Sequence, residues 1–222
     1  MAAFRQHLAF SSLLGVAYSG GVVALGHDWS HAAVAGLLCG ASGMLPDLDS
    51  PSSRPTREIF AFVSALGPLL ILNRFAAAGL SGEVGFLVAA GVYFLLRFGL
   101  ACFFARFTVH RGMLHSIPAA IIVGQLVYLL HDCADPWGNL ILAGGASLGY
   151  FSHLLLDELY SVDVQGLRVR LAKSAGSAIK LSSPSLGATL VTWSLLAGLT
   201  YLIGVQQGFL DPAILSLPHP RH

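Results

Sequence analysis

Long runs of apolar residues, separated by short polar islands, are the feature that most restricts how this chain can fold. An α-helix needs about 20 such residues to cross the hydrocarbon core of a membrane. Only 10% of the 222 residues are charged and 55% are hydrophobic, whereas about a quarter of a soluble domain is charged. The sequence therefore predicts an all-α, polytopic membrane protein with one integral membrane domain over residues 1–222.

The apolar runs predict about seven transmembrane helices, with six and eight as the alternatives. The expected ranges are 8–25, 31–45, 59–79, 84–105, 117–131, 137–157 and 186–206. The first run continues past Gly20 and Gly21 without a small-x-small cleavage site, so we expect a membrane helix there and not a signal peptide. Small residues four apart, Gly36 with Gly40 and Gly145 with Gly149, indicate close helix packing in lipid.

Basic residues are distributed unequally between the two ends of these helices. Nine of them fall on the side of the N-terminus: Arg5, Arg54, Arg57, Arg106, Arg111, Arg168, Arg170, Lys173 and Lys180. The other side receives Arg74 and Arg221, and Arg97 lies inside a helix. Because cytoplasmic loops carry the excess of Lys and Arg, the N-terminus is expected in the cytoplasm.

The charge balance and the cysteines exclude other classes of protein. The 12 Lys and Arg residues nearly balance the 11 Asp and Glu residues, which argues against a nucleic-acid-binding face. The three cysteines form no C-x-x-C pair, so neither a zinc finger nor a disulfide framework is expected.

Polar motifs occur at helix ends, and the expected topology brings four of them to the cytoplasmic side. His7 stands at the entrance of the first helix, and Asp47 and Asp49 follow Pro46, which ends the second helix. Two carboxylates this close repel each other unless a cation lies between them or one is protonated. The pair suggests a metal ligand set, and an Asp-rich turn that only ends the helix is the alternative.

The third motif precedes the fifth helix, where His110 and His115 flank Arg111. Ser116 is a plausible N-cap there. Imidazole nitrogens are common metal ligands, and a guanidinium can bind phosphate or carboxylate oxygens. The motif therefore suggests a site for a metal and an anion.

The fourth motif combines His153 and Asp157, which are four residues apart and share one face of the sixth helix. The ~16 residues from Trp137 to His153 rise only about 24 Å, which is less than the ~30 Å hydrocarbon thickness. We therefore expect His153 inside the cytoplasmic edge of the bilayer, in a pocket that a lipid headgroup can reach.

Two further polar regions have both a structural and a functional interpretation. A polar cluster on the opposite side is interpreted as exposed loop residues, with a second metal site as the alternative. Its members are His27, Asp28, His31, His131, Asp132 and Asp135. The basic segment 161–184 is expected to meet anionic headgroups. The alternative is that Lys173 and its neighbours form a lid that binds an anion.

The four motifs, in this order, resemble the LexA-regulated, membrane-bound, metal-dependent hydrolases of bacterial inner membranes. The resemblance covers residues 7 to 157 and implies a metal-dependent hydrolase in the bacterial inner membrane. The spacing of histidines and aspartates is also similar to that of zinc-dependent phospholipase C. This analogy makes phosphoester cleavage the leading reaction class.

The leading hypothesis is thus a hydrolase that cleaves a phosphoester of a lipid or lipid-linked substrate at the cytoplasmic leaflet. The candidate metal ligands are His7, Asp47, Asp49, His110, His115, His153 and Asp157. They exceed the three or four protein ligands of one catalytic zinc, so one or two divalent ions are expected, with zinc favoured over manganese, iron or magnesium. Arg111 and Lys173 would bind phosphoryl oxygens, and Asp49 is either a ligand or the general base.

Two alternatives come from other classes of protein: a transporter of divalent cations and a non-catalytic scaffold with a structural metal. Transporter sites tend to lie near the membrane midplane at a repeat interface, and no repeat is visible here. Structural zinc sites are usually closed by four ligands. The oligomeric state is left open by the sequence.

Overall fold

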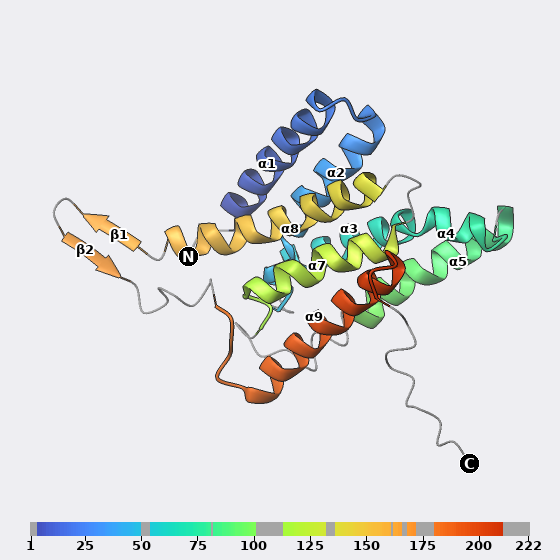
Figure 1. The fold of residues 1–222 in the computed structure, drawn as a ribbon. Coiled ribbons are helices and arrows are strands. Elements are labelled where there is room, and N and C mark those ends of the chain that lie inside the picture. The colour runs from blue at the N-terminus through green and yellow to red at the C-terminus, as the bar shows by residue number, and fades with distance from the viewer. Residues whose placement is uncertain are drawn as a thin grey trace, which may run out of the picture.

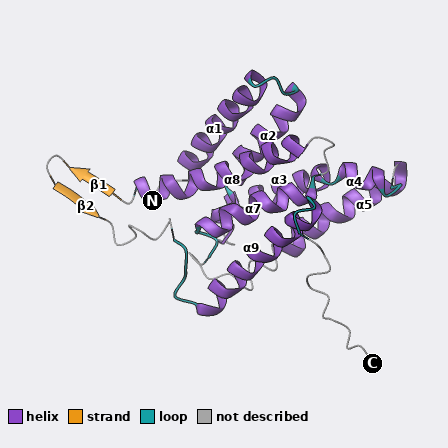
Figure 2. Cartoon of the chain, in the orientation of Figure 1, coloured by secondary structure: helices purple, strands orange, loops and turns teal. Residues whose placement is uncertain are grey.

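The structure, a computed structural model, consists almost entirely of helices (Figures 1 and 2). It describes residues 4–49, 54–80, 82–100, 113–131, 136–160, 162–165, 168–171 and 180–210. The α-helices are α1 (Phe4–Ala24), α2 (Trp29–Ser42), α3 (Arg54–Leu70), α4 (Leu72–Ala77), α5 (Gly82–Phe94), α7 (Ile117–Leu130), α8 (Pro136–Leu159) and α9 (Leu186–Gln206). A 3-10 helix, η1 (Leu45–Asp49), follows α2, and a π-helix, η2 (Leu95–Leu100), continues α5. The predicted helical class is confirmed.

A small β-hairpin is the exception to the helical fold. Strands β1 (Val162–Gln165) and β2 (Arg168–Leu171) pair antiparallel, with Val162 opposite Leu171. The hairpin lies at the start of segment 161–184, where a loop was expected. Lys173 lies outside the described residues, so its role in a lid stays a prediction.

Four helices among the described residues are long and apolar enough to cross a membrane. They are Arg5–Ala24, Gly82–Gly99, Trp137–Leu159 and Leu186–Gln206. Helices α2 and α7 have 14 residues each, which corresponds to only about 21 Å at 1.5 Å per residue. The described part of the chain thus has four helices suited to cross a membrane, and the expected total of seven crossings stays a prediction.

Two of the expected helices differ in shape from a single regular α-helix. The range 59–79 is divided between α3 and α4 at Ile71, three residues after Pro68. Proline lacks the N–H that would bond to the Ser64 carbonyl, so the missing bond lies in the turn before Pro68 and does not itself explain the break at Ile71. The range 84–105 passes from α5 into η2 at Leu95, and its last residues lie outside the description.

Helix α8 forms the centre of the molecule, with α1, α2 and α7 packed against it. Helix α9 packs on α7, and α3 packs on α5 (Figure 1). Buried side chains from four helices meet in one core: Ala35, Leu38, Leu70, Val127, Leu142 and Ala146. This arrangement leaves α5 and α9 at the periphery.

The central helices approach closely because glycines lie at their crossings. A Cβ on Gly36 would lie 2.6 Å from the Gly15 carbonyl oxygen of α1, and one on Gly145 would lie 2.8 Å from the Ala35 carbonyl oxygen of α2. A Cβ on Gly149 would fall on the Cys39 carbonyl. These three glycines confirm the packing interpretation, whereas Gly40 has ordinary contact distances, with its nearest neighbour atom at 3.7 Å.

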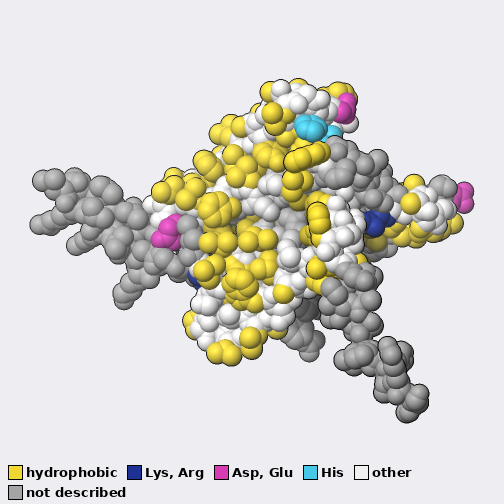
Figure 3. Space-filling model, in the orientation of Figure 1, with side chains coloured by type: hydrophobic (Ala, Val, Ile, Leu, Met, Phe, Trp, Pro, Cys, Tyr) yellow, Lys and Arg dark blue, Asp and Glu magenta, His cyan; other side chains and the backbone are white. Residues whose placement is uncertain are grey.

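The outer surface is rich in apolar side chains, as lipid contact requires. Helix α5 buries none of its residues and α9 buries Leu199 alone, among those described. Figure 3 shows hydrophobic side chains spread over the visible face, with charged groups confined to a few places. Since soluble monomers rarely expose apolar patches of this extent, the surface agrees with a membrane-embedded protein.

Candidate metal centre

Four separate segments bring histidine and aspartate side chains together at one end of the helix bundle. His7 comes from the first turns of α1 and Asp47 from η1, directly after α2. His115 precedes α7, and His153 and Asp157 lie in the last turns of α8. The antiparallel course of neighbouring helices explains the convergence, because starts of α1 and α7 then lie beside ends of α2 and α8.

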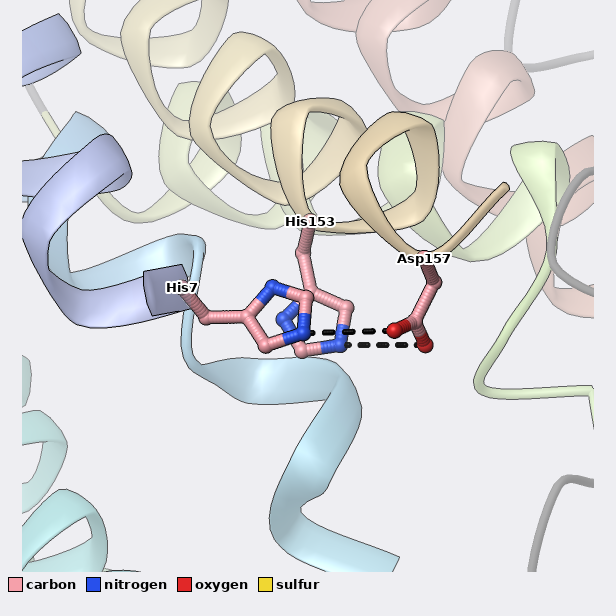
Figure 4. Close-up of side chains that lie close together, drawn as sticks. All are labelled: His7, His153 and Asp157. Carbon is pink, nitrogen blue, oxygen red and sulfur yellow. Dashed lines mark ion pairs between the residues drawn. The ribbon is translucent and has the colours of Figure 1, made fainter. Parts of the chain in front are cut away.

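His153 and Asp157 form the part of the cluster that the helical spacing predicts. Being four residues apart, both project from one face of α8 (Figure 4). His153 Nε2 lies 3.8 Å from Asp157 Oδ2. The expected shared face is confirmed.

His7 lies against this pair from the side of α1. Its Nε2 is 3.2 Å from Asp157 Oδ1. Its ring is stacked on that of His153, with centroids 3.8 Å apart and planes at 14° (Figure 4). His7 Nδ1 is buried and has no hydrogen-bond partner in the part of the chain that the structure describes. The stacking aligns two imidazoles toward one carboxylate.

Asp47 and His115 complete the cluster. Asp47 Oδ1 is 3.5 Å from His153 Nε2, and His115 Nε2 is 4.0 Å from Asp157 Oδ2. The His115 ring meets that of His153 edge to face, with centroids 5.7 Å apart. Each described ligand candidate therefore contacts at least one other.

Local interactions hold His115 in this position. Ser116 is the N-cap of α7, as predicted, because its side chain accepts a hydrogen bond from the Ala119 N–H. The Tyr150 hydroxyl of α8 donates to the Leu114 carbonyl oxygen. The turn before α7 is thus tied both to its own helix and to α8.

Four members of the cluster are buried and one is partly exposed. His7, His115, His153 and Asp157 are all at most 4% exposed, whereas the Asp47 side chain is 35% exposed. Asp47 is therefore the most exposed of the five described ligand candidates.

The spacing of the ligand atoms suits a divalent metal ion. Metal–ligand distances of about 2.0–2.2 Å separate neighbouring ligands of a tetrahedral ion by roughly 3.3–3.6 Å. The observed separations of 3.2, 3.5, 3.8 and 4.0 Å are close to this range. Two overlapping groups have all their ligand atoms within 4.8 Å of one another: His7 with His153 and Asp157, and Asp47 with His115 and His153. Both groups fit a metal by their donor chemistry.

Several predicted site residues are not part of this geometry. Asp49 is the last residue of η1, and its side chain lies outside what the structure describes. His110, Arg111 and Lys173 also lie outside the described residues. Their roles as ligand, general base or anion-binding groups stay predictions.

Sequence reasoning missed one contributor to the site, the backbone of Gly43. Its carbonyl oxygen lies 2.8 Å from His153 Nδ1. A carbonyl carries no side-chain signature. The only hint was a glycine three residues before Pro46, which was expected to end the helix; in the structure α2 ends at Ser42 and Pro46 lies in η1.

The histidines at the opposite end of the bundle are arranged differently. His31 Nε2 lies 3.0 Å from the Gly138 carbonyl oxygen, and its ring centroid is 6.1 Å from that of His131. Asp28 is the N-cap of α2, and hydrogen bonds from Ser30 lower the pKa of its carboxyl. No group of three metal ligands forms here among the described residues, and Asp132 and Asp135 lie outside them.

Comparison with known proteins places the chain in a family. No curated protein and no solved structure matches it. Residues 1–208 match the family described as YdjM inner membrane protein. The chain therefore belongs to this family and is an inner membrane protein.

Proposed function

We propose that this protein is a membrane-embedded, metal-dependent hydrolase that cleaves a phosphoester of a lipid or lipid-linked substrate. One observation carries the proposal: three histidines and two aspartates from four segments converge, with donor atoms 3.2–4.0 Å apart, in a chain of which only 10% is charged. Each ionisable group at bilayer depth costs about 2.5–3.5 kcal/mol on insertion scales. A bound cation would offset that cost and make such a cluster favourable.

The donors can be divided between one or two ions. His153 Nδ1 lies 2.8 Å from the Gly43 carbonyl oxygen, which can only accept a hydrogen bond, so a neutral His153 would keep one lone pair, on Nε2, and would bind one ion only. Asp157 has two oxygens, with Oδ1 toward His7 and Oδ2 toward His153 and His115. Asp157 is therefore suited to bind two ions, one through each oxygen. The imidazole-rich set favours zinc, with manganese, iron and magnesium as alternatives.

The partial exposure of Asp47 supports catalysis over a purely structural site. Structural zinc sites are closed, whereas catalytic sites keep a position open for water or substrate. When bound, a divalent ion would supply Lewis acidity to a phosphoryl oxygen and to water. The protein's own contribution is to hold the ligands, with Asp49 as the proposed ligand or base and Arg111 and Lys173 as the proposed anion-binding groups.

A lipid substrate is supported by the apolar residues next to the ligands. Leu8 and Phe10 follow His7 on α1, and both are exposed. The ~24 Å rise from Trp137 to His153 also leaves the site below the bilayer surface. Acyl chains would contact these side chains while the phosphate meets the cluster.

Metal analysis and a phosphate-release assay on the same purified protein test this proposal. Wild-type protein should contain about one or two divalent ions per chain. It should hydrolyse a substrate in a screen of phospholipids, isoprenyl phosphates and lysophosphatidates, measured as free phosphate from monoesters and as the phosphorylated product from phosphodiesters. His153→Ala and Asp157→Ala should lose both metal and activity. His27→Ala, a change to a histidine at the opposite end, is the matched control and should keep both. Full activity in metal-free protein would contradict the proposal.

A further inference from the structure

His153 has a hydrogen-bond partner outside the ligand cluster. The Gly43 carbonyl oxygen, at the C-terminal end of α2, lies 2.8 Å from His153 Nδ1. Since a carbonyl oxygen only accepts, the ring must donate its Nδ1 hydrogen. In a neutral imidazole the lone pair then lies on Nε2, the atom that faces Asp47 and Asp157. The bond directs the coordinating nitrogen into the cluster.

Residue 43 lies where three helices meet, and it has no room for a side chain. A Cβ there would fall on the Cβ of Ser11 from α1 and would lie 3.1 Å from the Gly149 carbonyl oxygen of α8. Ser11 is 1% exposed, and its hydroxyl donates to the Leu8 carbonyl oxygen. Neither neighbour can move aside easily, so a side chain at residue 43 would push the end of α2 away from His153.

We propose that Gly43 is a positioning residue for the metal centre. Its carbonyl oxygen holds His153 in the tautomer with the hydrogen on Nδ1, and its missing side chain lets α1, α2 and α8 meet closely enough for this contact. The consequence for metal affinity rests on the proposed function. Metal-binding histidines usually donate their second ring N–H to a partner, and loss of that partner weakens metal binding by about 10–100-fold.

The tautomer can be measured without any metal. Nitrogen NMR of metal-free protein labelled with ¹⁵N-histidine, with His153→Gln to assign the signals, should show His153 protonated on Nδ1. In Gly43→Ala the population should shift toward protonation on Nε2. A wild-type His153 protonated on Nε2 would overturn the proposal. If the expected tautomer is found in protein that binds no metal, the positioning role stands and the proposed function fails.

Zinc titrations of the purified protein test the steric step. Gly43→Ala should weaken zinc binding by about 10–100-fold. The double variant Ser11→Gly, Gly43→Ala should recover most of the affinity, because it removes the Ser11 atoms that the added methyl group would meet. A double variant that binds zinc no better than Gly43→Ala would contradict this step. Should Gly43→Ala fail to fold, the double variant and the wild-type tautomer still decide the question.

Gly145→Ala is the matched control for general loosening of the helix pair. Its methyl group would meet the Ala35 carbonyl oxygen at the same α2–α8 contact, two turns of α8 away from His153. It should lower stability and leave the His153 tautomer and zinc affinity unchanged. An equal loss of zinc affinity in Gly145→Ala and Gly43→Ala would show that residue 43 has no specific role.

Discussion

His7 contributes a nitrogen and a ring to the candidate metal centre, and the two contributions can be separated. The nitrogen faces Asp157 at 3.2 Å, and the ring stacks on His153. Stacking places an aromatic face against His153, and phenylalanine can supply it as well as histidine can. Only a histidine supplies a nitrogen donor. Substitution at this position therefore distinguishes a ligand from a packing residue.

We predict that His7→Phe and His7→Ala lose metal affinity to the same extent, at least about 10-fold, a lower bound taken from changes to indirect partners of metals. The reason is that both remove the nitrogen, whereas only the alanine removes the ring. Zinc titration of the purified variants measures this, with His27→Phe as the control. Wild-type affinity in His7→Phe would identify His7 as a packing residue.

The sequence predicted those site residues whose chemistry resides in side chains at regular spacing. His153 and Asp157 were found because four residues bring two side chains to one helix face. Asp47 and His115 were predicted because polar side chains directly beside apolar membrane segments indicate a functional role. The Gly43 carbonyl was not found, since any residue has one and only the fold decides which carbonyl meets His153.

Helix α8 connects the candidate metal centre to the packing of the whole bundle. Its last turns carry His153 and Asp157, and the turns before them cross α2 at Gly145 and Gly149. In lipid, where helices gain little from burying apolar surface, such close backbone contacts supply much of the association energy. The position of the site thus depends on glycines that never contact a ligand.

We predict that Gly149→Ala destabilises the protein by about 1–3 kcal/mol, the usual cost of overpacking. Its methyl group would fall on the Cys39 carbonyl and close to the Ser42 hydroxyl. Gly40→Ala, on the facing helix, should change stability by less than about 0.5 kcal/mol, because its nearest neighbour atom is 3.7 Å away. Unfolding in mixed micelles with increasing denaturing detergent measures both. Equal stability of the two variants would contradict the prediction.

At the level of elements, the sequence located the helices better than it described their form. Apolar runs mark helices clearly, but they do not reveal that α2 ends after 14 residues or that Ile71 separates α3 from α4. The β-hairpin did have a signal. Valines alternate with polar residues in Val162–Gln165, and Arg168–Leu171 alternates in the same way, which is typical of paired strands. The polarity of segment 161–184 concealed this pattern.

Among the described residues, the buried histidine and carboxylate side chains are concentrated at one end of the molecule. The five ligand candidates meet there, while His27, Asp28 and His31 mark the other end. The predicted topology assigns the ligand end to the cytoplasm, because nine basic residues were expected on that side. Orientation in the membrane therefore decides which leaflet can supply a substrate.

We predict that the ligand end faces the cytoplasm, which can be tested by cysteine labelling in whole cells. Leu25 lies at the opposite end and Tyr160 follows α8 at the ligand end, and both are exposed. In a chain whose three native cysteines are replaced, Leu25→Cys should react with a membrane-impermeant maleimide. Tyr160→Cys should react only after the cells are opened, since the inner membrane protects it. The reverse pattern would place the site at the periplasmic leaflet, and a cytoplasmic lipid phosphate could then not be its substrate.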